Sequence, residues 1–268
     1  MPNVIHIDQW LRRSEPDYYA MYINAWIPFN AWYVKEYNNT KDRDCLEQIC
    51  STSNVYRNKI IALLSGATPD AQRFRSYITT LHHELQRHSI PDEKPINFDN
   101  VLVQDNPTNV YQKDFGKYSF KWEYLRNSNP KCKCVVTHRT THTTIVTIDL
   151  AKWDEAELSA NHDYLGIGNE VVKRKVLEYF YLIKPKICIP IVVPPIGNGR
   201  KPQRCITIDD GCSLYFTENL DKISSAIVWM LYKLRCLIFH GNITPTTAHS
   251  SIYECAFYMQ RMLIKELI

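Results

Sequence analysis

The sequence has no long apolar run. The longest one, from Ile187 to Ile196, is interrupted by Pro190, Pro194 and Pro195. It is much shorter than the about 20 apolar residues that a membrane-spanning helix needs, so we expect no contact with a membrane. The N-terminal residues MPNVIHIDQW also lack the basic stretch followed by an apolar stretch that is typical of a secretory signal peptide.

The sequence also lacks a regular cysteine framework and a strong excess of charge. Its nine cysteines are an odd number at irregular spacings, which indicates small buried thiols in a reducing compartment. We therefore expect a cytoplasmic protein. The net charge of only +4 means that any binding to nucleic acid would depend on a local basic patch.

The overall composition is that of an ordinary globular protein. Hydrophobic residues make up 45% and charged residues 22% of the 268 residues, which is enough material for a core. Residues 1–95 and 216–268 have helical patterns, whereas 96–215 mixes short strands, turns and one helix. The pattern predicts a mainly α protein with an α+β insertion, in which both ends of the chain form one helical bundle.

In the N-terminal region, apolar residues at three- and four-residue steps predict three helices. The first, about 19–37, contains Pro28, which should kink it. The second is expected at about 42–64. The third should begin with Pro69 at its first position and end at about residue 88.

In the C-terminal region, an apolar stripe predicts a helix that begins at about Asn219 and stops at Gly241. Ser251 and Glu254 have the spacing of a capping box, S-x-x-E, which predicts that the last helix begins there. Within the predicted insertion, the Thr-rich segment 135–149 alternates as a strand does, and residues 169–183 should be helical.

The stretch LRCLIFHG places Arg235 and His240 at the end of the predicted C-terminal helix. Five helical residues separate two side chains by about 140° and about 7.5 Å along the axis, so both can border one groove. An imidazole can move the proton of a ribose 2′-hydroxyl, and a guanidinium can bind the phosphoryl oxygens. The structural alternative is that Arg235 pairs with a carboxylate and His240 caps the helix.

The segments LYKLRCLIFHGNITP and YINAWIPFNAWYVKEY resemble the HEPN superfamily of helical-bundle proteins, and in particular its bacterial defence and abortive-infection branch. Two features carry the resemblance: an R-x4-H element followed by glycine, and a first helix with the pattern W-x2-F-N-x2-Y, formed by Trp26, Phe29, Asn30 and Tyr33. The resemblance implies a metal-independent endoribonuclease that is active as a dimer, with Arg235 and His240 as its catalytic pair. In this family a polar residue usually follows the arginine, whereas in this sequence Cys236 follows it. This departure leaves open a HEPN-like module that binds RNA or protein without cutting.

Asn30 has two interpretations. Its amide either satisfies the backbone at the Pro28 kink, or it faces the groove of Arg235 and His240 and orients a phosphate or the imidazole. Four basic residues are candidates for RNA contacts, although each could equally be ordinary soluble surface: Arg200, Lys201 and Arg204 in one turn, and Arg139 in the Thr-rich segment.

Cys132, Cys134, His138 and His142 are residue types that bind zinc. On one strand, however, the two histidines would be about 13 Å apart, too far to share an ion. We therefore expect neither a metal nor another cofactor.

The leading prediction is an RNA-cleaving toxin or anti-phage defence effector. Its expected partners are RNA, a second copy of the chain, and an antitoxin or regulatory protein. The alternatives are a non-catalytic HEPN-like module that binds RNA or protein, and a zinc-dependent enzyme centred on the insertion.

Overall fold

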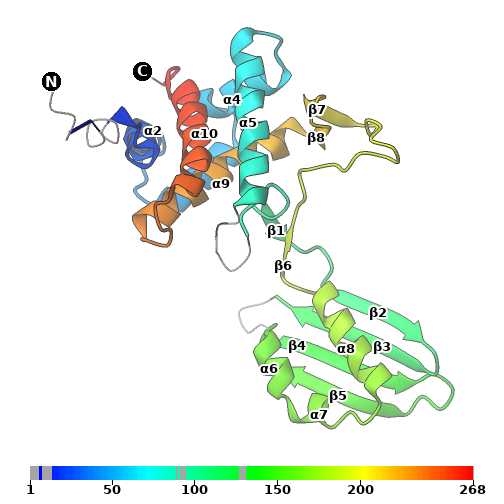
Figure 1. Ribbon diagram of the computed structural model, residues 1–268. Coiled ribbons are helices and arrows are strands. Elements are labelled where there is room, and N and C mark those ends of the chain that lie inside the picture. Colours follow the sequence, from blue (N-terminus) through cyan, green and yellow to red (C-terminus); the bar gives the residue numbers. More distant parts are fainter. Residues whose placement is uncertain (1–5, 8–13, 89, 91–94, 127–130, 268) are drawn as a thin grey trace. The chain divides into compact units, whose positions relative to one another are not determined.

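The computed structural model describes residues 6–7, 14–88, 90, 95–126 and 131–267. The chain is a mixed α+β protein with more helix than strand (Figure 1). It divides into two compact units, one of Met1–Leu102 with Ile189–Ile268 and the other of Val103–Cys188. Within the described residues, no helix is both long enough and apolar enough to cross a membrane.

The first unit contains six long helices and a β-hairpin among its described residues. They are α2 (Tyr18–Tyr37), α3 (Asp42–Ser51), α4 (Val55–Ser65), α5 (Pro69–Arg87), α9 (Leu220–Phe239) and α10 (Thr247–Ile264), with β7 (Cys205–Asp209) paired to β8 (Leu214–Thr217). The helix α10 packs against both α2 and α5, and α9 packs against α3 and α4. Elements from both ends of the chain therefore share one core.

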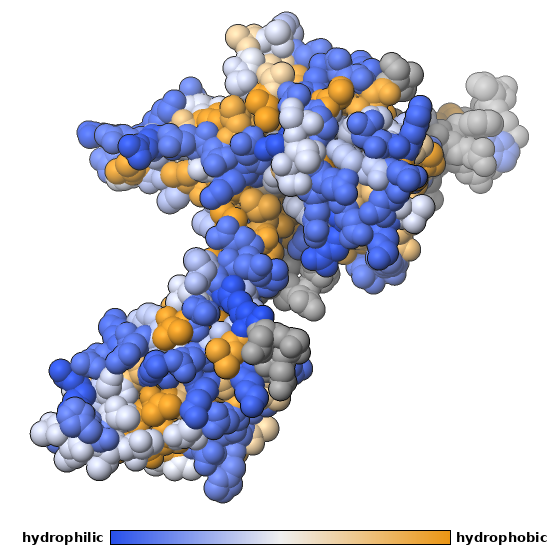
Figure 2. All heavy atoms as spheres, turned by 180° about the vertical axis from the view of Figure 1, so that it is seen from behind, coloured by the Kyte–Doolittle hydropathy of each residue, from blue (hydrophilic) through white to orange (hydrophobic). Residues whose placement is uncertain are grey.

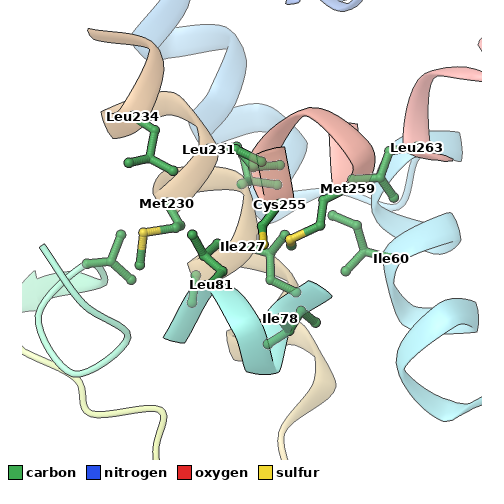
Figure 3. Packing of buried hydrophobic residues seen from close by; sticks show 14 of the residues in the cluster. Ile60, Ile78, Leu81, Ile227, Met230, Leu231, Leu234, Cys255, Met259 and Leu263 are labelled. Carbon is green, nitrogen blue, oxygen red and sulfur yellow. The ribbon is translucent and has the colours of Figure 1, made fainter. Parts of the chain in front are cut away.

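The core of this unit is apolar and closely packed. Figure 3 shows side chains from four helices meeting at its centre. Ile60 of α4, Ile78 of α5, Leu231 of α9 and Met259 of α10 are all fully buried there. Burial of a side chain of this size contributes about 1.5–3 kcal/mol, so the contacts among these helices account for much of the unit's stability.

The predicted helix at 42–64 is wrong, because the chain forms two helices there. Their boundary lies in the run Ser51–Asn54, where short polar side chains bind the backbone. Thr52 donates to the carbonyl of Gln48, and the Asn54 side chain accepts from the amide of Arg57. Polar groups that compete for backbone partners in this way end one helix and begin the next.

The predicted capping box is also wrong. The helix α10 begins five residues earlier, with Thr246 instead of Ser251 as its N-cap, and Thr246 accepts from the amide of His249 at 3.3 Å. Ser251 instead donates to Glu84 of α5, and Glu254 accepts from Tyr18 of α2. The S-x-x-E pair therefore connects α10 to its two neighbours.

The second unit is built around a four-stranded antiparallel sheet in the order β2-β3-β4-β5. Its strands are β2 (Val110–Phe115), β3 (Tyr118–Leu125), β4 (Lys131–His138) and β5 (Thr144–Leu150), and its helices are α6 (Glu155–Ala160), α7 (His162–Leu165) and α8 (Glu170–Leu182). Trp122 of β3 is fully buried, and its indole donates to the carbonyl of Val176 in α8. The short strands β1 (Val103–Asp105) and β6 (Lys186–Cys188) pair with each other where the chain enters and leaves the unit.

The compact α+β unit is shorter than the predicted insertion, 96–215. Residues 189–215 belong to the first unit, because Ile191, Ile208 and Leu214 are buried in the core that the long helices form. The Thr-rich segment 135–149 also differs from the predicted single strand. It turns after His138, and His142 adopts a left-handed φ of 56° in that turn, so the chain reverses there without glycine or proline.

Candidate active site at the end of helix α9

Arg235 lies near the end of α9 and pairs with the first residue of α3. Its Nη2 atom is 3.3 Å from Oδ2 of Asp42. Both side chains are mostly buried, with exposures of 17% and 21%. An ion pair at this depth is less screened than a surface pair, and it fixes the position of the guanidinium.

Asn30 and Tyr33 of α2 bind the other oxygen of the same carboxylate. The amide of Asn30 donates to Oδ1 of Asp42 at 3.2 Å, and the hydroxyl of Tyr33 donates to it at 2.8 Å. Asn30 also donates to the Tyr33 hydroxyl at 2.5 Å. The structure therefore brings Arg235 and Asn30 together through Asp42, rather than using Asn30 to satisfy the backbone near Pro28.

Asp42 is the residue of this network that sequence reasoning missed as a site residue. It begins α3, and an acidic side chain in the first turn of a helix is favoured by the helix dipole. That local role is a sufficient explanation of an aspartate in the sequence. Its second role, which is to hold Arg235, depends on packing between α3 and α9 and has no local sequence pattern.

Aromatic groups border the rest of the site. The guanidinium carbon of Arg235 lies 3.9 Å from the centre of the Phe239 ring, one turn further along α9. Burial, together with a hydrogen bond to Cys236, raises the pKa of Tyr232 to about 12. Cys236 is half-buried and is hydrogen-bonded to this phenol.

His240 is the C-cap of α9 and is exposed. The turn after it is a Schellman motif: Gly241, with a φ of 64°, donates to the carbonyl of Ile238, and Asn242 donates to that of Leu237. Within the described part of the chain, the imidazole has no hydrogen bond and no ion pair. It is available to a ligand, but the structure does not join it to Arg235.

The predicted RNA-contacting residues lie in separate places. Arg200, Lys201 and Arg204 are exposed in the segment before β7, in the first unit. Arg139 belongs to the second unit, where it pairs with Asp114 at 3.0 Å and donates to the carbonyl of Gly116. That contact joins two turns of the sheet, which gives Arg139 a structural role.

The possible zinc ligands are not arranged around a common point. Cys132 and Cys134 are fully buried in the apolar core of the second unit, and burial raises the pKa of Cys132 to about 12. His138 ends β4 and His142 lies in the following turn. Across the described residues, no group of three or more His, Cys, Asp or Glu side chains has the geometry of a metal site.

Comparison with known proteins gives no match: no family model fits the sequence, and no curated protein or solved structure is significantly similar to it.

Proposed function

We propose that the chain is a metal-independent endoribonuclease with a HEPN-like helical bundle, and that it acts in the cytoplasm as a toxin or anti-phage defence effector. The observation that carries the proposal is the convergence of Arg235 and Asn30 on Asp42, with an exposed His240 at the end of the same helix as Arg235. The resemblance to the HEPN superfamily implies Arg235 and His240 as the catalytic pair, and Asn30 belongs to the first-helix pattern that carries the resemblance. Arg235 and Asn30 both bind Asp42.

The chemistry follows from the groups present. One imidazole accepts the proton of a ribose 2′-hydroxyl while its oxygen attacks the adjacent phosphorus, and the bond to the 5′-oxygen breaks. A second imidazole, protonated, gives its proton to that departing oxygen. Arg235 stabilises the negative charge on the phosphoryl oxygens. DNA has no 2′-hydroxyl and is not a substrate by this route.

A dimer supplies the second imidazole. Each chain contributes one His240, so the scheme needs two copies whose α9 ends face each other. Exposed apolar side chains near the site are suited to such contact. Phe239 is 53% exposed beside Arg235, and Ile27 is 59% exposed one turn from Asn30. Figure 2 shows that hydrophilic side chains cover most of the visible surface, with apolar residues between them.

The decisive experiment is cleavage of a labelled single-stranded RNA by the full chain in EDTA. Replacing Arg235 or His240 by alanine should each reduce the rate by about 10²–10⁴. His249→Ala is the control, because His249 is a half-buried histidine in the first turn of the next helix, where its ring contacts the carbonyl of Thr244. Cleavage that requires a divalent metal, or that persists in either variant, contradicts the proposal.

The Arg235–Asp42 pair also favours a second candidate, a non-catalytic module that binds RNA or a regulatory protein such as an antitoxin. A paired guanidinium has part of its charge already neutralised, and Cys236 replaces the usual polar residue. This candidate predicts salt-dependent RNA binding with no cleavage of any substrate, and an unchanged affinity in His240→Ala.

A further inference from the structure

A pocket between α5 and α10 combines positive charge with stacked aromatic rings. Its volume is about 240 Å³, and it is lined by Arg73, Tyr77, Tyr258, Arg261, Met262 and Lys265. The volume is slightly below the about 300 Å³ at which pockets for drug-sized ligands begin. The pocket therefore suits a small ligand rather than an extended one.

The antiparallel packing of two helices forms this pocket. Ser251 of α10 contacts Glu84 near the end of α5, whereas Tyr258 stacks on Tyr77 closer to the start of α5. Continuing this register brings the last turn of α10 beside Arg73. Residues that are distant in the sequence thereby form one surface.

Helix dipoles account for only part of the positive charge at the pocket. The C-terminal dipole of α10 favours cations, so Arg261 and Lys265 have a local explanation. Arg73, however, lies in the N-terminal part of α5, where the dipole gives a cation no support. Arg73, Arg261 and Lys265 are all exposed, so water and salt weaken their mutual repulsion, and together they offer an anion three positive charges at one pocket.

Nearby acidic groups leave this charge largely uncompensated. Glu254 accepts a hydrogen bond from Tyr18 at 2.9 Å, and Glu266 lies 2.7 Å from Lys59. Asp70 approaches Arg73, but at 4.0 Å and with both side chains exposed. An exposed pair at that distance contributes little.

The tyrosines give the pocket a second chemical property. The rings of Tyr77 and Tyr258 are 5.1 Å apart and nearly parallel, at 7°. Both are half-buried, so their orientation is fixed while part of each ring remains accessible. Fixed aromatic rings beside basic side chains are how proteins bind nucleotides, because a base stacks on the ring and the phosphate meets the cations.

We propose that the α5–α10 pocket binds a nucleotide, with its phosphate on Arg73, Arg261 and Lys265 and its base against the Tyr77–Tyr258 pair. The nucleotide is either free or one residue of a single-stranded RNA. The pocket shares no residue with the Arg235–Asp42 network, so the proposal does not depend on RNA cleavage.

The test measures binding by the full chain in the His240→Ala background, in which RNA is expected to stay intact. The probes are AMP, a short oligouridylate, and an abasic ribose-phosphate strand of the same length. Arg73→Ala should weaken binding about tenfold and make the affinity for the strand less dependent on salt. Arg87→Ala is the matched control, because Arg87 lies on the same helix, pairs with an acid three residues away, and has an exposure of 69% against 63% for Arg73.

The outcomes separate the sources of the nucleotide. AMP binding that is lost in Arg73→Ala identifies a free nucleotide, and binding of oligouridylate alone with the same loss identifies an RNA strand. If Arg73→Ala and Arg87→Ala bind the probes with equal affinity, or if no probe binds, the proposed nucleotide site is wrong. An abasic strand that binds as tightly as oligouridylate overturns the role of the tyrosines. Melting curves establish that both variants remain folded.

Discussion

Arg235 and Asn30 lie on different helices from opposite ends of the chain, and each binds a different oxygen of one carboxylate. The contact distances to Asp42 are 3.3 Å and 3.2 Å. A single short side chain at the start of α3 therefore sets the positions of two residues that the sequence had nominated independently. If Arg235 acts on RNA, Asp42 is its positioning residue.

Asp42→Asn tests this role. The amide keeps one acceptor oxygen but loses the charge that pairs with Arg235, so we expect about 1–2 kcal/mol of lost stability. We also expect cleavage to fall about tenfold to a hundredfold, because small displacements of a catalytic group are costly. The loss should appear mainly as a lower kcat, with a smaller change in KM.

Asp44→Asn is the control for that variant. Asp44 lies in the same first turn of α3 and is exposed, with a contact of 3.4 Å to Asn39. It should change neither cleavage nor stability measurably. If Asp42→Asn unfolds at the same denaturant concentration as the wild type and cleaves RNA at the same rate, Asp42 does not position Arg235.

Association of two copies should depend on Ile27. This side chain is 59% exposed on α2, three residues before Asn30, and therefore on the same side of the helix. Ile27→Asp should convert a dimer to a monomer in sedimentation velocity and reduce cleavage in parallel. Val55→Asp is the comparison, because Val55 is 51% exposed at the start of α4. A wild type that is monomeric at all concentrations, yet cleaves, contradicts the two-chain scheme.

The elements that the sequence predicts well are those with uninterrupted apolar periodicity. The helices α5 and α9 begin and end within a residue or two of expectation, because Thr68 and Asn219 cap them and Gly241 stops the second. Local chemistry determines these boundaries. At Ser51–Asn54 and at Ser251, polar residues had more than one available partner. There the local pattern was not enough to predict where a helix begins or ends.

The candidate site was only partly predictable for the same reason. Arg235 and Asn30 could be predicted as site residues from their own segments. Their common partner, Asp42, could not be predicted, because only tertiary packing brings it to them. The same limit applies to the Tyr77–Tyr258 pair. Each tyrosine has an ordinary place on a helix, and the pocket exists only because α5 and α10 are antiparallel.

Gly241 should matter for the geometry of the site as well as for stability. Its φ of 64° is left-handed, while a Cβ added there would meet nothing within 4 Å. Gly241→Ala should therefore cost about 1–2 kcal/mol from backbone strain alone, and Gly241→Asn should cost less. Gly168→Ala, at a glycine without positive φ and with open space around it, should be close to neutral. Equal unfolding free energies of Gly241→Ala and the wild type would mean that the turn after His240 tolerates other conformations.

His82 should make the stability of the protein depend on pH. It is 6% exposed, its Nδ1 atom has no partner within the described residues, and burial lowers its pKa below the ordinary 6.5. The unfolded chain therefore binds a proton more readily than the folded protein, so the free energy of unfolding should fall as pH drops below about 6.5. His82→Leu should remove part of this dependence in urea unfolding at pH 7.5 and 5.5. His83→Leu, at its half-buried neighbour, should retain most of it, because burial lowers the pKa of His82 more than the charge of His83 does. A dependence of the same size in both variants would assign the effect to other groups.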